Sequence, residues 1–233
     1  MTISLSIIVP VYNEEQTIAE VIERICEVDI GAVQKEIIIV NDGSADGTAA
    51  AIERSPWRSD RRIRVYDNPI NLGKGAAIRL GLRHASGDMM LIQDADLELD
   101  PREYGSLLAP LRDGRADVVY GSRFLNSNPA IPTRTRRANR FLTWLTNLLF
   151  NGRLTDMETG YKVFTRDALA GIRLRAVGFD FEPEVTARLL RAKRRIHEVP
   201  LTYRPRRQDE GKKISWSDGL DAIYMLIKCR LYP

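Results

Sequence analysis

The sequence predicts an α/β fold with a mostly parallel central sheet flanked by helices. Apolar runs rich in Val and Ile alternate with amphipathic stretches through the first half, as in repeated strand–helix units. Several of these runs are nearly continuous, which is typical of strands covered on both faces. A polar cluster follows each run, at the sheet edge where ligands bind in such folds.

The expected strands are short runs that end in turn residues. They cover 5–12, 36–42, 62–68, 88–94 and 116–123. The first reads LSIIVPVY and the second EIIIVND, and both are rich in β-branched residues. We therefore expect helices on both sides of this part of the sheet.

Helices are expected between and after these strands, at 13–28, 43–55, 73–85 and 100–114. Apolar residues recur at helical spacing in the first of them, at Ile18, Val21, Ile22 and Ile25. Asn13 is a candidate cap for this helix, and Ser44 or Asp46 for the next. Asp100 is expected to cap the helix at 100–114, with Pro101 in its first turn.

The pattern is less regular after residue 124. We expect an amphipathic helix at 139–152, a mixture of turn and strand at 153–164, and a helix at 181–195. An edge strand at 196–206 and a final helix at 216–232 complete the chain. The length of 233 residues fits one domain, with halves at 1–123 and 124–233.

Composition places the chain among ordinary globular proteins, with 44% hydrophobic and 28% charged residues. Cys26 and Cys229 form no metal-site or disulfide pattern, so a reducing cytosol is expected. The longest apolar stretches fall far short of the roughly 20 residues that a membrane span needs. The first residues lack a basic segment, and we expect no secretory signal peptide.

Positive charge is concentrated in the second half of the chain. The net charge is +4, but residues 134–140 alone carry four arginines. Residues 191–213 carry nine Lys or Arg against three acids. This distribution favours an anionic partner, namely a phosphate, a membrane face or a nucleic acid.

Four acids follow the apolar run at 89–92. Asp94, Asp96 and Glu98 alternate along a turn, and Asp100 is assigned to the helix cap. Carboxylates spaced in this way at a strand end can converge on Mg²⁺ or Mn²⁺, which often share their ligands with substrate phosphates. An isolated pattern of this kind is more often an acidic surface turn.

Other motifs accompany the acids in a fixed order: IIVPVYNE, IVNDGSADGT, NLGKG, DADLE, GSR, DMETGYKVF and HEVPLTYRPR. Together they resemble glycosyltransferase family 2, whose members have the GT-A fold. Within it the chain is most similar to dolichyl-phosphate mannose synthases and related polyprenyl-phosphate glycosyltransferases. The resemblance covers nearly the whole chain. It implies that residues 1–123 bind a nucleotide-sugar and that 124–233 bind the acceptor.

The resemblance also implies which residues bind the nucleotide-diphospho-sugar. The segment matching the base and ribose site contains Pro10, Tyr12, Asn13 and Glu14. Asp42 matches an acid that contacts the base or ribose, and Lys74 stands near the nucleotide. The metal-and-diphosphate motif is matched by Asp94, Ala95 and Asp96. Glu98 stands where the dolichyl-phosphate branch often has Gln, and is a candidate third metal ligand.

Each of these residues has a purely structural alternative. Asn13 can cap a helix, Asp42 with Gly43 is a turn dipeptide, and Lys74 can be a solvated surface lysine. The GKG sequence lacks the spacing of a P-loop. No G-x-G-x-x-G follows an expected strand, which disfavours a dinucleotide-binding protein.

The concentration of positive charge in the second half of the chain favours an anionic acceptor. A hydroxyl acceptor needs a general base, whereas a phosphate monoester, with a second pKa near ~6, is already largely ionised at neutral pH. It needs cations instead. The candidate acceptor-phosphate contacts are Arg123, Arg137, Lys162, Arg204 and Lys212.

The candidate catalytic residues are Asp94, Asp96, Arg123 and Asp156. Asp156 matches an acid near the acceptor in related enzymes. With a hydroxyl acceptor it is a candidate base, and with a phosphate acceptor it is expected to order the neighbouring cations. A capping role in a turn is the structural alternative.

Two helices are candidates for contact with a membrane surface. The helix at 139–152 places five apolar side chains on one face, Phe141, Trp144, Leu145, Leu148 and Leu149. The final helix carries Ile223, Leu226 and Ile227. Both patterns suit an interfacial helix or an ordinary core helix. We expect a cytoplasmic protein that is peripheral at the membrane face or anchored by a membrane partner.

The sequence therefore predicts an inverting, metal-dependent hexosyltransferase. Its donor is expected to be of the GDP-mannose or UDP-glucose type, and its acceptor a polyprenyl or dolichyl phosphate. The alternative is a GT-A transferase that acts on a carbohydrate or other hydroxyl. A nucleic-acid-binding protein gains little from a metal site at Asp94 and Asp96, and no nucleic acid partner is expected.

Overall fold

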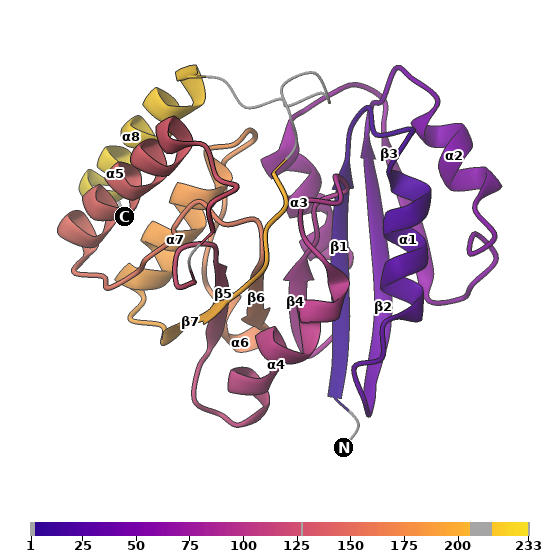
Figure 1. Ribbon diagram of the computed structural model, residues 1–233, viewed down its shortest axis with the longest axis horizontal. Coiled ribbons are helices and arrows are strands. Elements are labelled where there is room, and N and C mark those ends of the chain that lie inside the picture. The colour runs from indigo at the N-terminus through magenta and orange to yellow at the C-terminus, as the bar shows by residue number, and fades with distance from the viewer. Residues whose placement is uncertain (1–2, 127, 206–215, 233) are drawn as a thin grey trace.

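Seven strands form one sheet in the order β3-β2-β1-β4-β6-β5-β7 (Figure 1). The structure is a computed structural model that describes residues 3–126, 128–205 and 216–232. Helices cover both faces of the sheet, and in Figure 1 α1, α2 and β3 lie at the right and α5, α7 and α8 at the left. This arrangement confirms the predicted α/β class.

The strands are β1 (Ile3–Val11), β2 (Val33–Asp42), β3 (Ile63–Asn68), β4 (Met89–Ile92), β5 (Val118–Ser122), β6 (Lys162–Thr165) and β7 (Ile196–Pro200). β1 is parallel to β2 and β4, and β3 is parallel to β2. β7 lies at the sheet edge, as predicted, but ends at Pro200, earlier than expected, and it is parallel to β5. β6 is antiparallel to both of its neighbours, so the sheet is mostly, not wholly, parallel.

The antiparallel strand β6 matters for the site. It lies between β4 and β5, so the two halves of the chain share one sheet. Because β6 starts at the edge where its neighbours end, the segment before it lies beside the acidic turn after β4. Tyr120 of β5 is in register with Lys162, and Leu91 of β4 with Val163.

The helices are α1 (Ile18–Glu27), α2 (Thr48–Arg54), α3 (Lys74–His84), the 3₁₀ turn η1 (Pro101–Glu103), α4 (Tyr104–Arg112), α5 (Thr133–Phe150), α6 (Arg166–Leu169), α7 (Phe181–Arg191) and α8 (Trp216–Leu231). Helix α5 starts earlier than predicted, directly after Pro132, whose fixed φ suits a helix start. The short helix α6 was not predicted.

The predicted helix caps agree only in part with the observed helix starts. Asp100 accepts a hydrogen bond from the Arg102 N–H and caps η1, as predicted. The prediction that Asn13 caps the first helix is wrong, because α1 begins at Ile18. Asp46 stands just before the α2 cap position and accepts a hydrogen bond from the Thr48 N–H at 3.0 Å. Ser44 instead accepts from the backbone of Asn13.

Two apolar cores lie on opposite faces of the sheet. Helices α1, α2 and α4 contribute to one, and α3, α5, α7 and α8 to the other. Along the described ranges, no helix combines the length and the apolar character that crossing a membrane requires. The core thus fixes the sheet between two helical layers and leaves its carboxyl edge to the polar loops.

Candidate active site

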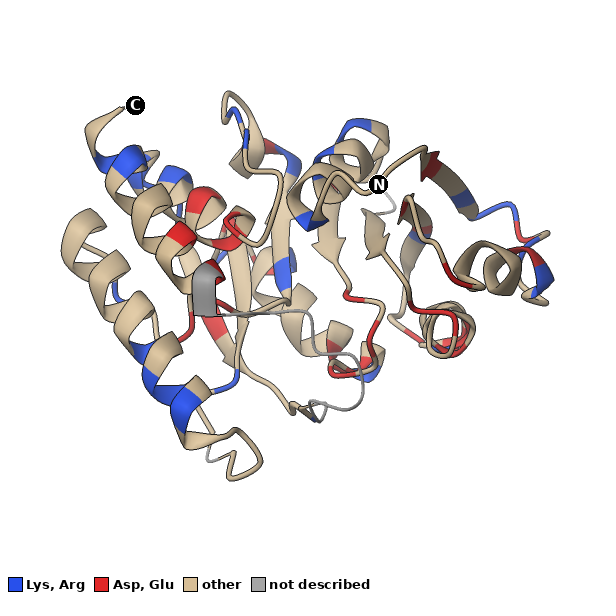
Figure 2. Ribbon diagram, turned by 90° about the horizontal axis from the view of Figure 1, so that it is seen from above, with Lys and Arg blue, Asp and Glu red and all other residues tan. Residues whose placement is uncertain are grey.

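The loops that follow the parallel strands meet at one edge of the sheet, viewed from above in Figure 2. The loop after β1 is tied to the loop after β2. Asn13 donates its backbone N–H to the Ser44 hydroxyl at 3.0 Å and accepts from the Ala45 N–H at 2.8 Å. The Glu14 N–H donates to the Thr48 hydroxyl at 2.8 Å. These bonds hold Asn13 with φ at +48°, in the left-handed region.

The same loop also contacts the acidic turn after β4. The Thr17 hydroxyl lies 2.7 Å from a Glu14 carboxylate oxygen and 2.7 Å from the Ala95 carbonyl oxygen. Pro10 is buried in β1, in register with Val40. The structure therefore brings together the segments that contain the predicted donor-binding residues. Their contacts with a nucleotide stay a prediction.

Asp42 is buried at the end of β2 and orders the turn that precedes α3. One carboxylate oxygen accepts from the Asn68 amide at 2.7 Å and the Leu72 N–H at 3.1 Å. The other accepts from the Gly73 N–H at 2.7 Å. Asp42 thus has a structural role whether or not it also contacts a base or ribose, which stays a prediction.

Lys74 is the first residue of α3 and points into the site. Its Nζ lies 2.8 Å from Asp94 Oδ1 and 3.1 Å from Glu182 Oε1. Burial alone would lower the pKa of Lys74, but the two carboxylates outweigh it and raise the pKa. The surface-lysine alternative is therefore wrong: Lys74 is a cation held between β4 and α7.

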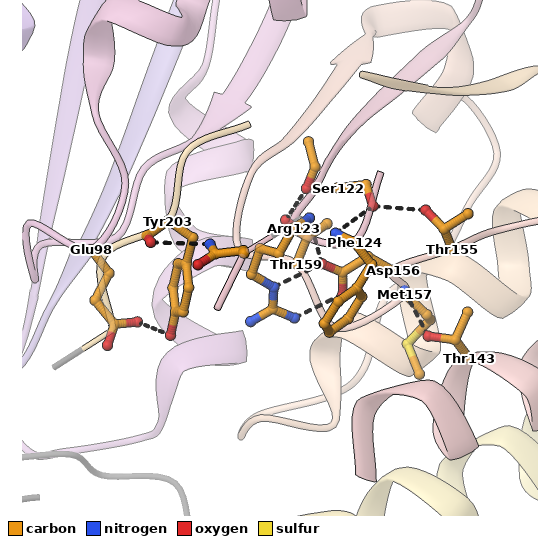
Figure 3. A network of polar contacts seen from close by, with 12 residues as sticks. Glu98, Ser122, Arg123, Phe124, Thr143, Thr155, Asp156, Met157, Thr159 and Tyr203 are labelled. Atoms are coloured by element: carbon orange, nitrogen blue, oxygen red, sulfur yellow. Dashed lines mark hydrogen bonds and ion pairs between the residues drawn. The ribbon is translucent and has the colours of Figure 1, made fainter. Parts of the chain in front are cut away.

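Gln93 fixes the point where β4 passes into the acidic turn. Its side-chain oxygen accepts from the Tyr104 and Tyr161 hydroxyls at 2.8 and 2.7 Å. Asp96 then folds back and accepts the Glu98 N–H at 3.1 Å. The Glu98 carboxylate accepts the Tyr203 hydroxyl at 2.6 Å, as Figure 3 shows. The acids are thus held in defined positions.

The acid pair has the chemistry for a divalent metal. Asp94 Oδ1 faces Lys74, and Oδ2 lies over Gly160, where an added Cβ would stand 2.3 Å from it. That space is open only because residue 160 is glycine. In the part of the chain described, no three Asp, Glu, His or Cys side chains are grouped to hold a metal. The arrangement fits an ion that shares its ligands with substrate phosphates; a third ligand at Glu98 stays a prediction.

Arg123 and Asp156 form a buried pair at the end of β5 (Figure 3). Two guanidinium nitrogens of Arg123 each donate to an Asp156 oxygen at 2.7 Å, and its backbone N–H donates at 3.0 Å. Asp156 is 0% exposed. Burial opposes the charge on Arg123, but the Asp156 carboxylate outweighs it and raises the arginine pKa. Bidentate pairs of this kind fix geometry as well as charge.

Aromatic rings extend this pair towards α5. The Arg123 guanidinium lies 5.2 Å from the Tyr203 ring centroid and 5.6 Å from that of Phe124. Arg140 of α5 lies 5.9 Å from the same Phe124 ring. Arg123 and Arg140 therefore share the Phe124 ring, whereas the residue predicted from the sequence on this helix was Arg137. Arg137 and Arg140 are three residues apart and so lie on one face of α5, a spacing that could have pointed to both.

The other predicted acceptor contacts are placed differently. Arg137 is exposed on α5. Arg204 follows β7, and its backbone N–H donates to the Glu98 carbonyl at 3.1 Å. Lys212 lies outside the described residues. A contact between any of these and an acceptor phosphate stays a prediction.

Lys162 is buried below the acidic turn. Its Nζ donates to the Thr159 carbonyl and lies 4.8 Å from the Tyr120 ring centroid. Burial lowers its pKa to about 8, and the neighbouring acids, Glu182 first, oppose that effect. Lys162 is only 1% exposed, so its nearest partners are protein groups, and its contact with an acceptor stays a prediction.

Two acids of the site, Glu158 and Glu182, were not predicted from the sequence. Oε1 of Glu158 and Oε2 of Glu182 are buried without a hydrogen-bond partner among the described residues. Burial, and after it the negative charge of Glu182, raises the pKa of Glu158 to about 7. Two acids in FEPE at a helix start, and the acid inside DMETG, were the available signals. Buried acceptors without a protein partner are places where water, an ion or a ligand can supply the donor.

The sequence profile of Glycosyl transferase family 2 matches residues 6–175. The chain belongs to glycosyltransferase family 2. The matched range includes Asp94 and Asp96 at the end of β4, and their role in binding a metal stays a prediction. The activity is accordingly that of a glycosyltransferase.

Curated relatives of this glycosyltransferase differ in length. Glycosyltransferase AglD of Haloferax volcanii is 30% identical over 210 residues, and the match covers 88% of this chain and 34% of the relative. Dolichyl-phosphate beta-glucosyltransferase ALG5D of Trichomonas vaginalis is 29% identical, with 98% and 73% covered. Undecaprenyl-phosphate mannosyltransferase of Micrococcus luteus is 28% identical, with 88% and 85% covered. The chain thus spans about a third of the first of these.

Solved structures share the fold of the glycosyltransferase. Glucosyl-3-phosphoglycerate synthase of Mycobacterium tuberculosis, in complex with Mn²⁺, UDP and phosphoglyceric acid, has a TM-score of 0.76 at 24% identity. The match covers 99% of this chain and 80% of that one. The same enzyme with Mg²⁺ and UDP has a TM-score of 0.73 at 23% identity. The predicted GT-A fold is confirmed.

Proposed function

We propose that the chain is an inverting, metal-dependent transferase that moves a sugar from a nucleotide-diphospho-sugar to a polyprenyl phosphate. The donor is of the GDP-mannose or UDP-glucose type. Two of the three relatives described above are named for transfer to dolichyl or undecaprenyl phosphate. In this proposal residues 1–123 make most of the donor contacts and residues 124–233 make most of the acceptor contacts.

The hydrogen bonds and the burial of Asp156 support a phosphate acceptor over a hydroxyl acceptor. Both of its carboxylate oxygens accept hydrogen bonds from Arg123, and the side chain is fully buried. A carboxylate in that position is poorly placed to take a proton from an acceptor hydroxyl. A phosphate acceptor is already ionised and needs no base. Asp156 then orients Arg123, and Arg123 with Arg140 binds the acceptor phosphate.

The acidic turn after β4 is proposed to hold the donor. Asp94 and Asp96 would hold Mg²⁺ or Mn²⁺, which when bound offsets the negative charge of the departing diphosphate. Lys74 keeps Asp94 in place and remains charged throughout the physiological range. Glu158 and Glu182 are proposed to accept hydrogen bonds from sugar hydroxyls, which would satisfy their buried oxygens.

A lipid acceptor requires contact with a bilayer. Phe141, Trp144 and Leu148 on α5 are 50%, 56% and 64% exposed, whereas Leu145 and Leu149 pack against the core. On α8, Leu226 is buried and Ile227 is exposed. Outward apolar side chains behind a basic helix start suit an interfacial helix. We propose a peripheral protein at the cytoplasmic membrane face, with a membrane partner as the alternative anchor.

The experiment is direct transfer of labelled sugar. The protein is incubated with Mn²⁺, a set of labelled nucleotide-sugars and undecaprenyl phosphate, and lipid-extractable label is counted. The matched control is the Asp96→Asn variant, which keeps the size of the side chain and loses its charge. Label in lipid for one donor only would identify the donor. Transfer to carbohydrate hydroxyls with none to lipid would overturn the proposed acceptor.

A further inference from the structure

A second basic site lies away from the acidic turn, between α7, α8 and the segment before α7. It is a cavity of about 470 Å³. Five cationic side chains line it, Arg173, Arg175, Arg188, Arg191 and Lys228. Figure 2 shows Lys and Arg gathered at the C-terminal end of α8, on this side of the molecule. The volume falls in the range of small-molecule sites.

The only acid lining the cavity among the described residues is Glu184, and its capacity is already used. One carboxylate oxygen accepts the backbone N–H groups of Arg175 and Ala176, both at 2.7 Å. The other lies 2.9 and 2.8 Å from two nitrogens of Arg188. Glu184 therefore offsets one cation and leaves four without a carboxylate in the wall.

Helix ends explain only part of this charge. Cations are favourable near helix C-termini, and Arg191 donates to the carbonyl oxygens of Cys229 and Arg230 at the end of α8. Lys228 also lies in the last turn of α8. Arg173 and Arg175 are different, because they lie in the non-helical segment between α6 and α7. A helix C-terminus therefore does not account for their charge.

We propose that this cavity binds the phosphate group of a ligand, at a site separate from sugar transfer. Guanidinium groups from the segment before α7 and from α7, with the ammonium of Lys228, would surround one phosphate. Met225, Cys229 and Ile172 form an apolar floor, which suits a phosphate that carries an organic group. A phospholipid headgroup and a soluble phosphate ester share this chemistry.

The test variant is the double substitution Arg173→Ser with Lys228→Ser. Both side chains are exposed, and neither forms an ion pair with another described residue, so the fold is expected to be unaffected. The matched control is Arg61→Ser, an exposed arginine beside β3 and outside the cavity. Sugar transfer by both variants should equal that of the wild type.

Binding is measured in two arms. Inorganic phosphate is titrated by calorimetry at constant ionic strength, with chloride as the comparison salt. Binding to phosphatidylcholine vesicles is measured with and without phosphatidylglycerol. We expect the double variant to bind phosphate at least 10-fold more weakly than the wild type and Arg61→Ser. An equal loss on phosphatidylglycerol vesicles identifies a lipid headgroup, and a loss confined to free phosphate identifies a soluble ester.

The Arg123→Ala variant distinguishes phosphate binding in the cavity from phosphate binding at the proposed acceptor site. Phosphate binding that persists in Arg123→Ala and is lost in the double variant supports the cavity. Phosphate binding that is lost in Arg123→Ala and unchanged in the double variant overturns the proposal. The proposal is also overturned if the double substitution weakens chloride binding as much as it weakens phosphate binding. Failure of sugar transfer to lipid would leave this result untouched.

Discussion

Lys74 Nζ lies 2.8 Å from Asp94 Oδ1, so a fixed cation of the protein already occupies one oxygen of the acid pair. The same ammonium group reaches Glu182 on α7. One positive charge thus offsets part of the negative charge of Asp94 and Glu182 before any donor arrives. Because the other Asp94 oxygen faces the space over Gly160, the residue can serve a lysine and a metal at the same time.

Replacing Lys74 by Met is expected to destabilise the protein by about 3 kcal/mol, because two largely buried carboxylates lose their cation. Mn²⁺ should recover part of this loss, so its stabilising effect should be larger in the variant than in the wild type. Urea unfolding with and without Mn²⁺ measures both quantities. Lys193→Met, at an exposed lysine, is the control. Equal Mn²⁺ effects in the two proteins would contradict a metal site at Asp94.

Gly160→Ala tests the space beside Asp94 more narrowly. The new Cβ would stand 2.3 Å from Asp94 Oδ2, so the carboxylate must move. We expect at least a 10-fold higher Mn²⁺ requirement for transfer, measured from initial rates against Mn²⁺ concentration. Gly105→Ala in α4 has nothing within 4 Å and serves as the control. An unchanged Mn²⁺ dependence would show that Asp94 Oδ2 does not face the ion.

Local features of the fold could be predicted from the sequence. The first five strands and the acidic turn follow from apolar runs that end in Asp, Asn and Gly, and these signals lie within ten residues of one another. Asp100 as a cap is of the same kind, since its partner Arg102 is two residues away. Asn13 was misassigned as a helix cap because its real partners, Ser44 and Ala45, lie more than thirty residues further along the chain.

Contacts of the site that cross the chain could not be predicted. Lys74 meets Glu182 only because α3 and α7 lie on the same face of the sheet. Arg123 meets Asp156 because β6 enters antiparallel and carries its preceding loop to the carboxyl edge. Hydrophobic patterning is the same for a parallel and an antiparallel β6, so topology decides these pairs. The motif resemblance identified Arg123 and Asp156 but not their bond.

A double-mutant cycle distinguishes the two roles considered for Asp156. If Asp156 acts by holding Arg123, the variants Arg123→Ala and Asp156→Ala and their combination should lose similar amounts of transfer. The coupling should then be on the order of 1–3 kcal/mol in kcat/KM. If Asp156 is a base, the two losses should multiply. Arg123→Lys, which keeps the charge but not the bidentate geometry, should retain partial activity in the first case.

Glu158 gives stability a pH dependence. Burial, then the Glu182 carboxylate, raises its pKa to about 7, above its ordinary value of 4.5. A raised pKa means that the folded protein binds the proton more tightly, so this contribution is complete below pH 4.5 and is lost as pH rises through 7. Glu158→Gln should remove that decline in urea unfolding between pH 5 and 7.5. The control is Glu53→Gln, at an exposed ion pair with Arg58, which should keep the wild-type dependence of unfolding free energy on pH. If Glu158→Gln also keeps that dependence, Glu158 is not its source.

Two arginines of α5, Arg137 and Arg140, are expected to contribute differently to acceptor binding. Arg123 and Arg140 lie 5.6 and 5.9 Å from the same Phe124 ring centroid, so an acceptor phosphate beside that ring can reach both cations. Losing a hydrogen bond to a charged group costs about 1.5–3 kcal/mol. Arg140→Ala should therefore raise the KM for undecaprenyl phosphate at least 10-fold.

Arg137 is the matched comparison, one helical turn earlier. Both arginines are exposed, but Arg140 lies over the Phe124 ring and no such contact is found for Arg137 among the described residues. A cation without a direct contact contributes through the general attraction to an anionic surface, which salt screens. Arg137→Ala should raise the acceptor KM less than 3-fold, and 0.5 M NaCl should abolish the difference from the wild type. The effect of Arg140→Ala should survive the same salt, because a direct contact is screened much less. If both variants respond alike to salt, Arg140 acts on the membrane surface and not on the acceptor phosphate.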